Sequence, residues 1–216
     1  MKNKNLKYAQ SRLRKKLLTL SAFLFIAALG YLDHKYNFLG SQKPAISQTQ
    51  DANDWDKYNQ KTFVGIKAVD GDTIDINIPD GKYRHTRIRM LGIDTPETKN
   101  PNMPVMYFGP EAYNFTKGKI LGKNITVLMD LASNPRDKYG RLLAHIELED
   151  GSILNKELLT NGFAYADTRF PHSFKKEYVA LEKQAQKEKR GLWKNITLEQ
   201  MPKWRQRTGA TKALRH

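Results

Sequence analysis

Between residues 58 and 94, short β-rich runs alternate with two strong turn signals, Asp70-Gly71 and Pro79-Asp80-Gly81. Asp-Gly flanked by alternating apolar residues is typical of a β-hairpin, and Pro-Asp-Gly is typical of a tight turn. The pattern therefore predicts three consecutive antiparallel strands joined by hairpins. The ordered part of the chain is expected to begin with this sheet.

The segment that follows predicts one helix, two more strands and two further helices. Gly109-Pro110-Glu111 is a typical helix start, because proline is favoured in the first turn. The helices are expected over residues 109–121, 154–161 and 173–189, and the strands over residues 124–130 and 142–149. This order of elements predicts an α+β fold, a closed five-stranded OB-fold barrel with about three helices. The groove of such a barrel commonly receives single-stranded nucleic acid.

The N-terminal part of the chain looks like a targeting segment. Residues 1–16 are rich in Lys and Arg, and residues 17–32 form an uncharged apolar run, expected to be a helix. This combination is typical of an export signal or a membrane anchor, with the N-terminus on the cytoplasmic side. The run is slightly short of the roughly 20 residues that span a bilayer, and its small-residue cleavage site is poor. We favour an uncleaved anchor, and a cleaved signal remains open; either places the domain outside the cytoplasm.

The remaining chain divides by composition into a linker, one domain and a tail. Residues 33–57 are polar and aperiodic, which predicts a linker, and residues 58–195 contain all the predicted strands and helices. Residues 196–216 are basic and aperiodic, which predicts a flexible tail. The chain has no cysteine, so disulfides, thiolate nucleophiles and thiolate-bound zinc are excluded.

The charge balance favours a polyanionic partner without identifying one. The formal net charge is +15, from 37 Lys and Arg against 22 Asp and Glu. Eight of the basic residues and one of the acidic residues lie within residues 1–40, which leaves 29 against 21 in the remainder. That remainder is still basic, as expected of a protein that neutralises phosphates.

Four carboxylates gather in two short motifs, VDGDT from Val69 and IDTPET from Ile93, each where a strand enters a turn. Carboxylate and carbonyl oxygens favour calcium or magnesium, whereas zinc or iron normally recruits His or Cys. The five histidines show no metal-ligand spacing. Turn chemistry alone also explains each motif taken singly, since Asp94 can cap the turn before Pro96. The metal hypothesis therefore depends on the motifs occurring together.

The motifs VDGDT, RIRMLGIDTPET and DKYGR occur in this order within one predicted domain, followed by GLW from Gly191. In this combination the chain resembles the staphylococcal nuclease family over about residues 61–193. The resemblance implies a five-stranded OB barrel with three helices. It also implies a calcium-dependent nuclease that hydrolyses DNA and RNA with low sequence specificity, by attack of water on phosphorus. One calcium ion is the expected cofactor, and the expected products carry 3′-phosphates.

The resemblance assigns the metal ligands residue by residue. Asp72 and Asp94 resemble the carboxylates that bind the ion, and the backbone carbonyl of Thr95 resembles the third protein ligand. Asp70 resembles a carboxylate that supports these ligands without contacting the ion.

Three further residues resemble the catalytic groups of the family. Glu97 resembles the carboxylate that binds or deprotonates the attacking water, and Arg89 and Arg141 resemble the paired arginines on the scissile phosphate. Arginine suits this place because its planar fork donates two hydrogen bonds to one phosphate and stays charged. Such groups stabilise the charge that grows on the equatorial oxygens.

Substrate contacts are expected within the DKYGR motif and after Gly162. Lys138 and Tyr139 resemble residues that lie beside the terminal phosphate and base. After Gly162 the chain departs from the pattern of the family, and we assign stacking or cationic contacts to Tyr165, Arg169 and Phe170.

Two other functions compete with the nuclease. A non-catalytic OB module that binds nucleic acid would need the groove but not the carboxylates and arginines that are present. A tethered adaptor whose basic surface contacts anionic lipid would leave the acidic motifs unexplained. We therefore expect a monomeric nuclease acting on single-stranded or frayed DNA and on RNA.

Overall fold

The computed structural model describes residues 53–98 and 104–207. The predicted basic leader, the apolar segment 17–32, most of the predicted linker and residues 208–216 lie outside the described residues. Among the residues that are described, no helix is long and apolar enough to cross a bilayer. The elements below all belong to one compact unit.

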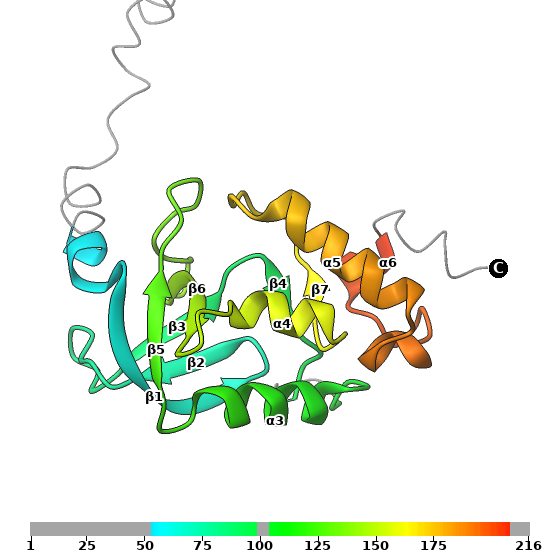
Figure 1. The fold of residues 1–216 in the computed structure, drawn as a ribbon, viewed down its shortest axis with the longest axis horizontal. Coiled ribbons are helices and arrows are strands. Elements are labelled where there is room, and N and C mark those ends of the chain that lie inside the picture. The colour runs from blue at the N-terminus through cyan, green and yellow to red at the C-terminus, as the bar shows by residue number, and fades with distance from the viewer. Residues whose placement is uncertain (1–52, 99–103, 208–216) are drawn as a thin grey trace, which may run out of the picture. The chain divides into compact units, whose positions relative to one another are not determined.

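Five strands close into a barrel (Figure 1). They are β1 (Lys61–Asp70), β2 (Thr73–Ile76), β3 (Thr86–Met90), β5 (Asn124–Leu128) and β6 (Leu142–Leu148). Their order around the barrel is β1-β2-β3-β6-β5, and β5 pairs with β1 to close it. Neighbouring strands are antiparallel except β3 and β6, which are parallel. The predicted five-stranded OB-type barrel, including its three leading antiparallel strands, is confirmed.

Three longer helices pack against this barrel, as the sequence predicted. They are α3 (Gly109–Ile120), α4 (Leu154–Thr160) and α5 (Lys175–Lys187). In Figure 1, α3 runs below the barrel, while α5 lies toward the end of the molecule where the C-terminal elements gather. Two short elements follow, the 3-10 helix η1 (Gly191–Lys194) and the helix α6 (Lys203–Arg207).

Alternation along β3 determines which side chains reach the surface of the barrel. Thr86, Ile88 and Met90 are buried, whereas Arg87 and Arg89 between them are only partly buried. Since successive side chains of a strand point to opposite faces, both arginines lie outside the barrel core. The apolar core that holds the strands in this register also contains buried residues of β2, β5 and β6, among them Ile74, Ile76, Ile125, Val127, Leu142 and Ile146.

A second, two-stranded sheet lies beside the barrel. It pairs β4 (Ile93–Asp94) with β7 (Tyr165–Ala166) in antiparallel register, with Ile93 opposite Ala166 and Asp94 opposite Tyr165. This pairing links the IDTPET motif to the segment after Gly162. It thus brings together two regions that the sequence analysis treated separately.

The N-terminal edge of the domain extends further than the predicted boundary at residue 58. Residues 53–58 form a helical turn in which Asp54 and Tyr58 are buried. The guanidinium of Arg136 donates to both oxygens of Asp54, at 2.6 and 2.7 Å, and pairs with Asp80 at 2.7 Å. This bridge ties the start of the domain to a hairpin turn and to the loop before β6.

The C-terminal edge also differs from the prediction, which placed a flexible tail from residue 196. Residues 196–207 fold against the domain, with Ile196 and Met201 buried beside Trp193 and Tyr165. The buried side chain of Arg205 pairs with the buried Glu182 of α5 at 2.6 Å. The apolar residues of this segment are too irregularly spaced for a periodic pattern to reveal their burial.

Candidate active site

The turn of the VDGDT motif packs directly on the IDTPET motif. A Cβ atom at Gly71 would lie 2.7 Å from the Thr95 hydroxyl oxygen, so only glycine allows the two turns to approach this closely. Asp72 then accepts hydrogen bonds at one oxygen, Oδ2, from the backbone N–H of Thr95 at 2.8 Å and from its hydroxyl at 3.1 Å. The close approach holds a buried carboxylate in one orientation.

Arg89 lies between the two predicted metal carboxylates. Its Nη1 atom contacts Oδ1 of Asp72, and its Nη2 atom donates to Oδ1 of Asp94 at 2.6 Å. All three side chains are largely buried, with exposed fractions of 15% for Arg89, 7% for Asp72 and 19% for Asp94. Two carboxylates at this burial repel one another unless a positive group lies between them. The guanidinium shows that a cation fits there, and the all-oxygen donor set suits calcium or magnesium.

Asp70 and Glu97 form a second carboxylate pair beside the first. Asp70 accepts from the Thr98 hydroxyl at 2.7 Å and from the Gly71 N–H at 2.8 Å, and Glu97 accepts from the Thr98 N–H at 3.0 Å. Burial raises the pKa of Asp70 to about 6; the Thr98 hydroxyl opposes this shift, and the adjoining Glu97 carboxyl adds to it. The structure therefore brings Asp70, Asp72, Arg89, Asp94 and Glu97 into one region.

Arg141 lies directly before β6, the strand that pairs with β3, but its side chain has a different partner from that of Arg89. The parallel pairing of β3 with β6 places Arg89 opposite Leu143, two residues after Arg141. The Arg141 guanidinium donates to Asp137 at 2.7 Å and lies 5.6 Å from the ring centroid of Tyr139. In this conformation the side chain belongs to the DKYGR turn. Its predicted contact with the scissile phosphate stays a prediction.

The predicted substrate residues divide into exposed and buried groups. Tyr139 is 72% exposed with the Lys138 ammonium 4.9 Å from its ring centroid, and Phe170 is 57% exposed beside the Arg169 guanidinium. These two rings offer accessible faces. Tyr165 is fully buried against Trp193. This differs from the stacking role that the sequence suggested for Tyr165, because a ring without exposed surface offers no face to a base.

One residue at the site had not been predicted. The indole N–H of Trp204, in α6, donates to Oδ2 of Asp94 at 2.6 Å. Arg169 approaches the same oxygen at 3.6 Å, and its guanidinium lies 4.3 Å from the Trp204 ring centroid. Trp204 follows Asp94 by 110 residues in a segment without a motif. Local sequence patterns carry no signal for such a contact.

Comparison with known proteins agrees with this geometry. Residues 87–195, half of the chain, match the family described as staphylococcal nuclease homologue. The chain belongs to the staphylococcal nuclease family. The resemblance that the three ordered motifs indicated is confirmed.

Named relatives within the staphylococcal nuclease family include thermonucleases and an endonuclease. The chain is 37% identical over 138 residues to the thermonuclease of Staphylococcus hyicus, and the matched region covers 63% of this chain and 78% of that protein. It is 38% identical over 136 residues to the thermonuclease of Staphylococcus intermedius, covering 63% and 76%. Endonuclease YncB of Bacillus subtilis (strain 168) is 34% identical over 144 residues, covering 62% and 64%.

A second polar cluster in this member of the staphylococcal nuclease family is fully buried. Candidate ligand atoms of Asp130, His145 and His172 lie within 4.8 Å of one another, although no sequence spacing had linked them. Asp130 accepts from the Ser173 N–H at 2.6 Å and from its hydroxyl at 2.8 Å, and it contacts His145 at 3.3 Å. The other ring nitrogen of His145 bonds the Tyr178 hydroxyl at 2.8 Å. These bonds give Asp130 and His145 a structural role, because they join β6 to α5 and to the residues just before it.

Burial of this cluster should make stability depend on pH. Burial lowers the pKa of His145 to about 4, below the value of about 6.5 expected in the unfolded chain. Between pH 6.5 and pH 4 the unfolded chain therefore binds protons more strongly than the folded protein does. The stabilisation that the neutral His145 contributes is complete above pH 6.5 and is lost as the pH falls toward 4. The loss from this residue is expected to be about 3 kcal/mol.

Denaturant unfolding at several pH values between 4 and 7 measures this effect. In His145→Gln the free energy of unfolding should depend less on pH. Tyr178→Phe removes one hydrogen bond but keeps the histidine, so it should lower the free energy of unfolding without changing its slope against pH. An equal slope in His145→Gln and the unmodified protein would contradict the assignment.

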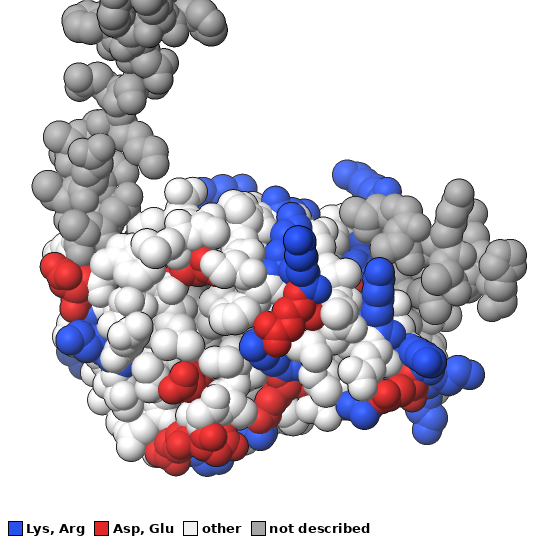
Figure 2. All heavy atoms as spheres, turned by 45° about the horizontal axis from the view of Figure 1, so that its top comes forward, with Lys and Arg blue, Asp and Glu red and all other residues white. Residues whose placement is uncertain are grey.

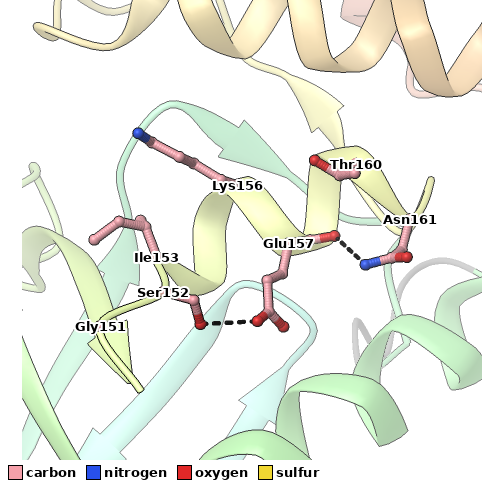
Figure 3. Close-up of a pocket in the computed structure, with 7 residues that line it drawn as sticks. All are labelled: Gly151, Ser152, Ile153, Lys156, Glu157, Thr160 and Asn161. Carbon is pink, nitrogen blue, oxygen red and sulfur yellow. Dashed lines mark hydrogen bonds between the residues drawn. The ribbon is translucent and has the colours of Figure 1, made fainter. Parts of the chain in front are cut away.

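A shallow hollow at the start of α4 is separate from the nuclease-family motifs (Figure 3). It is lined by Gly151, Ser152, Ile153, Lys156, Glu157, Thr160 and Asn161. Its carboxylate, Glu157, accepts from the Ser152 hydroxyl at 2.8 Å and pairs with Lys119 at 2.6 Å.

On the face drawn in Figure 2, Lys and Arg side chains are interspersed with Asp and Glu rather than gathered into one uniform basic surface. The basic excess of the sequence is therefore not concentrated on that face. The guanidiniums of Arg89 and Arg169, by contrast, lie beside the Asp94 carboxylate.

Proposed function

We propose that this protein is a calcium-dependent nuclease that hydrolyses phosphodiester bonds of DNA and RNA with low sequence specificity. The observation that carries the proposal is a pair of carboxylates, the buried Asp72 and the partly buried Asp94, held on either side of one positive group. Membership of the staphylococcal nuclease family and relatives named thermonuclease and endonuclease support it.

The chemistry of the proposed reaction follows from the charge of the substrate. A phosphodiester resists attack because it is anionic, and a calcium ion bound by Asp72, Asp94 and the Thr95 carbonyl would neutralise part of that charge. The Arg89 guanidinium, once released from the carboxylates, donates two hydrogen bonds to the phosphate. Arg141 adds a second guanidinium when it leaves Asp137. Glu97 binds and orients the attacking water, or removes its proton.

The proposed substrates are single-stranded or frayed nucleic acids, with products that carry 3′-phosphates. The exposed rings of Tyr139 and Phe170, each beside a cationic side chain, support this choice because base stacking on an aromatic face tolerates any sequence. We propose that a single subunit acts, since all the groups named lie on one chain.

We further propose an extracytoplasmic location, with the domain anchored by residues 17–32 or secreted if that segment is cleaved. Sizing the mature protein in membrane and soluble fractions decides between the two. Recovery of uncleaved protein in the cytoplasmic fraction would contradict both.

Digestion of denatured DNA by the purified full-length protein tests the nuclease. Cleavage is expected with calcium and should cease when a chelator is added in excess. Parallel reactions with magnesium and with RNA define the metal and the substrate class. Cleavage that survives chelation would overturn the metal-dependent reaction, and retention of DNA without cleavage would indicate a non-catalytic OB module instead.

A further inference from the structure

The C-terminal helix α6 reaches the carboxylate that the proposed function assigns to the metal. Trp204 donates its indole N–H to Oδ2 of Asp94 at 2.6 Å, while Oδ1 of Asp94 faces Arg89 and, beyond it, Asp72. The two oxygens of Asp94 are thereby divided between two different neighbours. Trp204 holds Oδ2, and Oδ1 is directed to the place between the two carboxylates where the Arg89 guanidinium lies.

The residue after Trp204 anchors the helix in the same region. Arg205 pairs with Glu182 at 2.6 Å, and the other carboxylate oxygen of Glu182 accepts from the backbone N–H of Ala166 at 3.1 Å. Ala166 is paired in β7 with Ile93, the neighbour of Asp94 in β4. Two successive residues of α6 are therefore tied to the strand pair that carries Asp94: Trp204 contacts the Asp94 side chain, and Arg205 is linked to the Ala166 backbone through Glu182.

The face of the indole ring is held as well. The Arg169 guanidinium lies 4.3 Å from the ring centroid of Trp204 and is itself paired with Asp167 at 2.7 Å. Stacking of a guanidinium on an indole is favourable and restricts rotation of the ring. The orientation of the indole N–H is thus determined by contacts on both α6 and the loop after β7.

From these contacts we infer that Trp204 is a positioning residue for the metal carboxylate. By binding Oδ2 it prevents the Asp94 carboxylate from rotating and presents Oδ1 toward Asp72. The inference rests on the proposed function. It adds that the metal site is completed by residues 203–207, outside the motifs and beyond the residues 87–195 that match the family. Outer hydrogen-bond partners of this kind typically change metal affinity by roughly 10- to 100-fold.

Trp204→Phe tests the inference because it removes the N–H donor and keeps an aromatic ring for Arg169. The variant is expected to bind calcium about tenfold more weakly in calorimetric titration, and its cleavage of denatured DNA should require about tenfold more calcium. At saturating calcium its turnover should return to that of the unmodified protein. A purely structural role would not produce this recovery.

Trp193→Phe is the matched control. Trp193 packs in the same C-terminal cluster, and its buried indole nitrogen has no hydrogen-bond partner among the residues that the structure describes. The same chemical change there should leave calcium affinity unaltered. Thermal unfolding without calcium shows whether each variant is folded. Should Trp204→Phe fail to fold, Arg169→Lys, which keeps the positive charge beside Asp94 but loses the planar stack on the indole, should give a smaller loss of affinity in the same direction.

The outcomes separate the inference from the proposed function. Equal calcium affinity in folded Trp204→Phe and the unmodified protein, or an equal loss in Trp193→Phe, overturns the positioning role alone. Failure of the unmodified protein to bind calcium overturns the proposed function and the inference with it.

Discussion

Replacement of Arg89 with lysine is expected to lower turnover on denatured DNA by about 100- to 1000-fold, with little change in calcium affinity. The guanidinium of Arg89 reaches Asp72 and Asp94 with two separate nitrogens, which shows that its planar fork is aimed into the site. A lysine keeps the charge but offers a single point of contact, so it stabilises the growing negative charge on phosphorus oxygens less well. Single-turnover kinetics at saturating calcium isolates this effect.

Arg87→Lys provides the matched control for this experiment. Arg87 lies two residues earlier on the same strand, is also only partly buried, and pairs with Asp75 at 2.7 Å rather than with the site. Its replacement should leave turnover within about a factor of two to three, as for a surface substitution. Unchanged turnover in Arg89→Lys would mean that Arg89 does not contact the reacting phosphate.

Asp94→Asn should abolish calcium-dependent cleavage, with a loss of about 1000-fold or more. The amide has about the same size but lacks the charge that binds a divalent cation. A ligand that binds only the folded state raises the unfolding temperature, so calcium should stabilise the unmodified protein and no longer stabilise the variant. Without calcium the variant should remain folded, because Asp72 still pairs with Arg89.

Glu157→Gln serves as the control for removal of a carboxylate, since Glu157 lies on α4 in the separate hollow of Figure 3. It should respond to calcium as the unmodified protein does. Persistent calcium-dependent cleavage by Asp94→Asn would place the catalytic metal elsewhere.

Much of the barrel and part of the site could be predicted because their signals are local. The alternation in TRIRM predicts a strand, and the structure shows that it buries Ile88 and leaves Arg89 outside the core. Asp-Gly at residues 70 and 71 marks the turn that carries Asp72. In both cases two or three neighbouring residues determine the backbone conformation, so the sequence pattern suffices.

Other features depend on contacts between distant segments and leave no periodic signal. The burial of Tyr165 follows from packing with Trp193 and η1, and the position of Trp204 follows from the anchoring of Arg205 on Glu182. The conformation of Arg141 follows from its pairing with Asp137, which no pattern of residue types reveals. Tertiary packing, rather than local preference, decided these positions.

The bridge from Arg136 to Asp54 gives the domain a mechanical property. Any tension exerted through the chain that precedes residue 53 enters the domain at the helical turn, whose Asp54 is bound by Arg136. Arg136 also donates to the Gly140 carbonyl at 2.8 Å, within the DKYGR turn. The helical turn at residues 53–58 and the DKYGR turn are thus joined through one guanidinium, so that displacement of either turn acts on the other through Arg136.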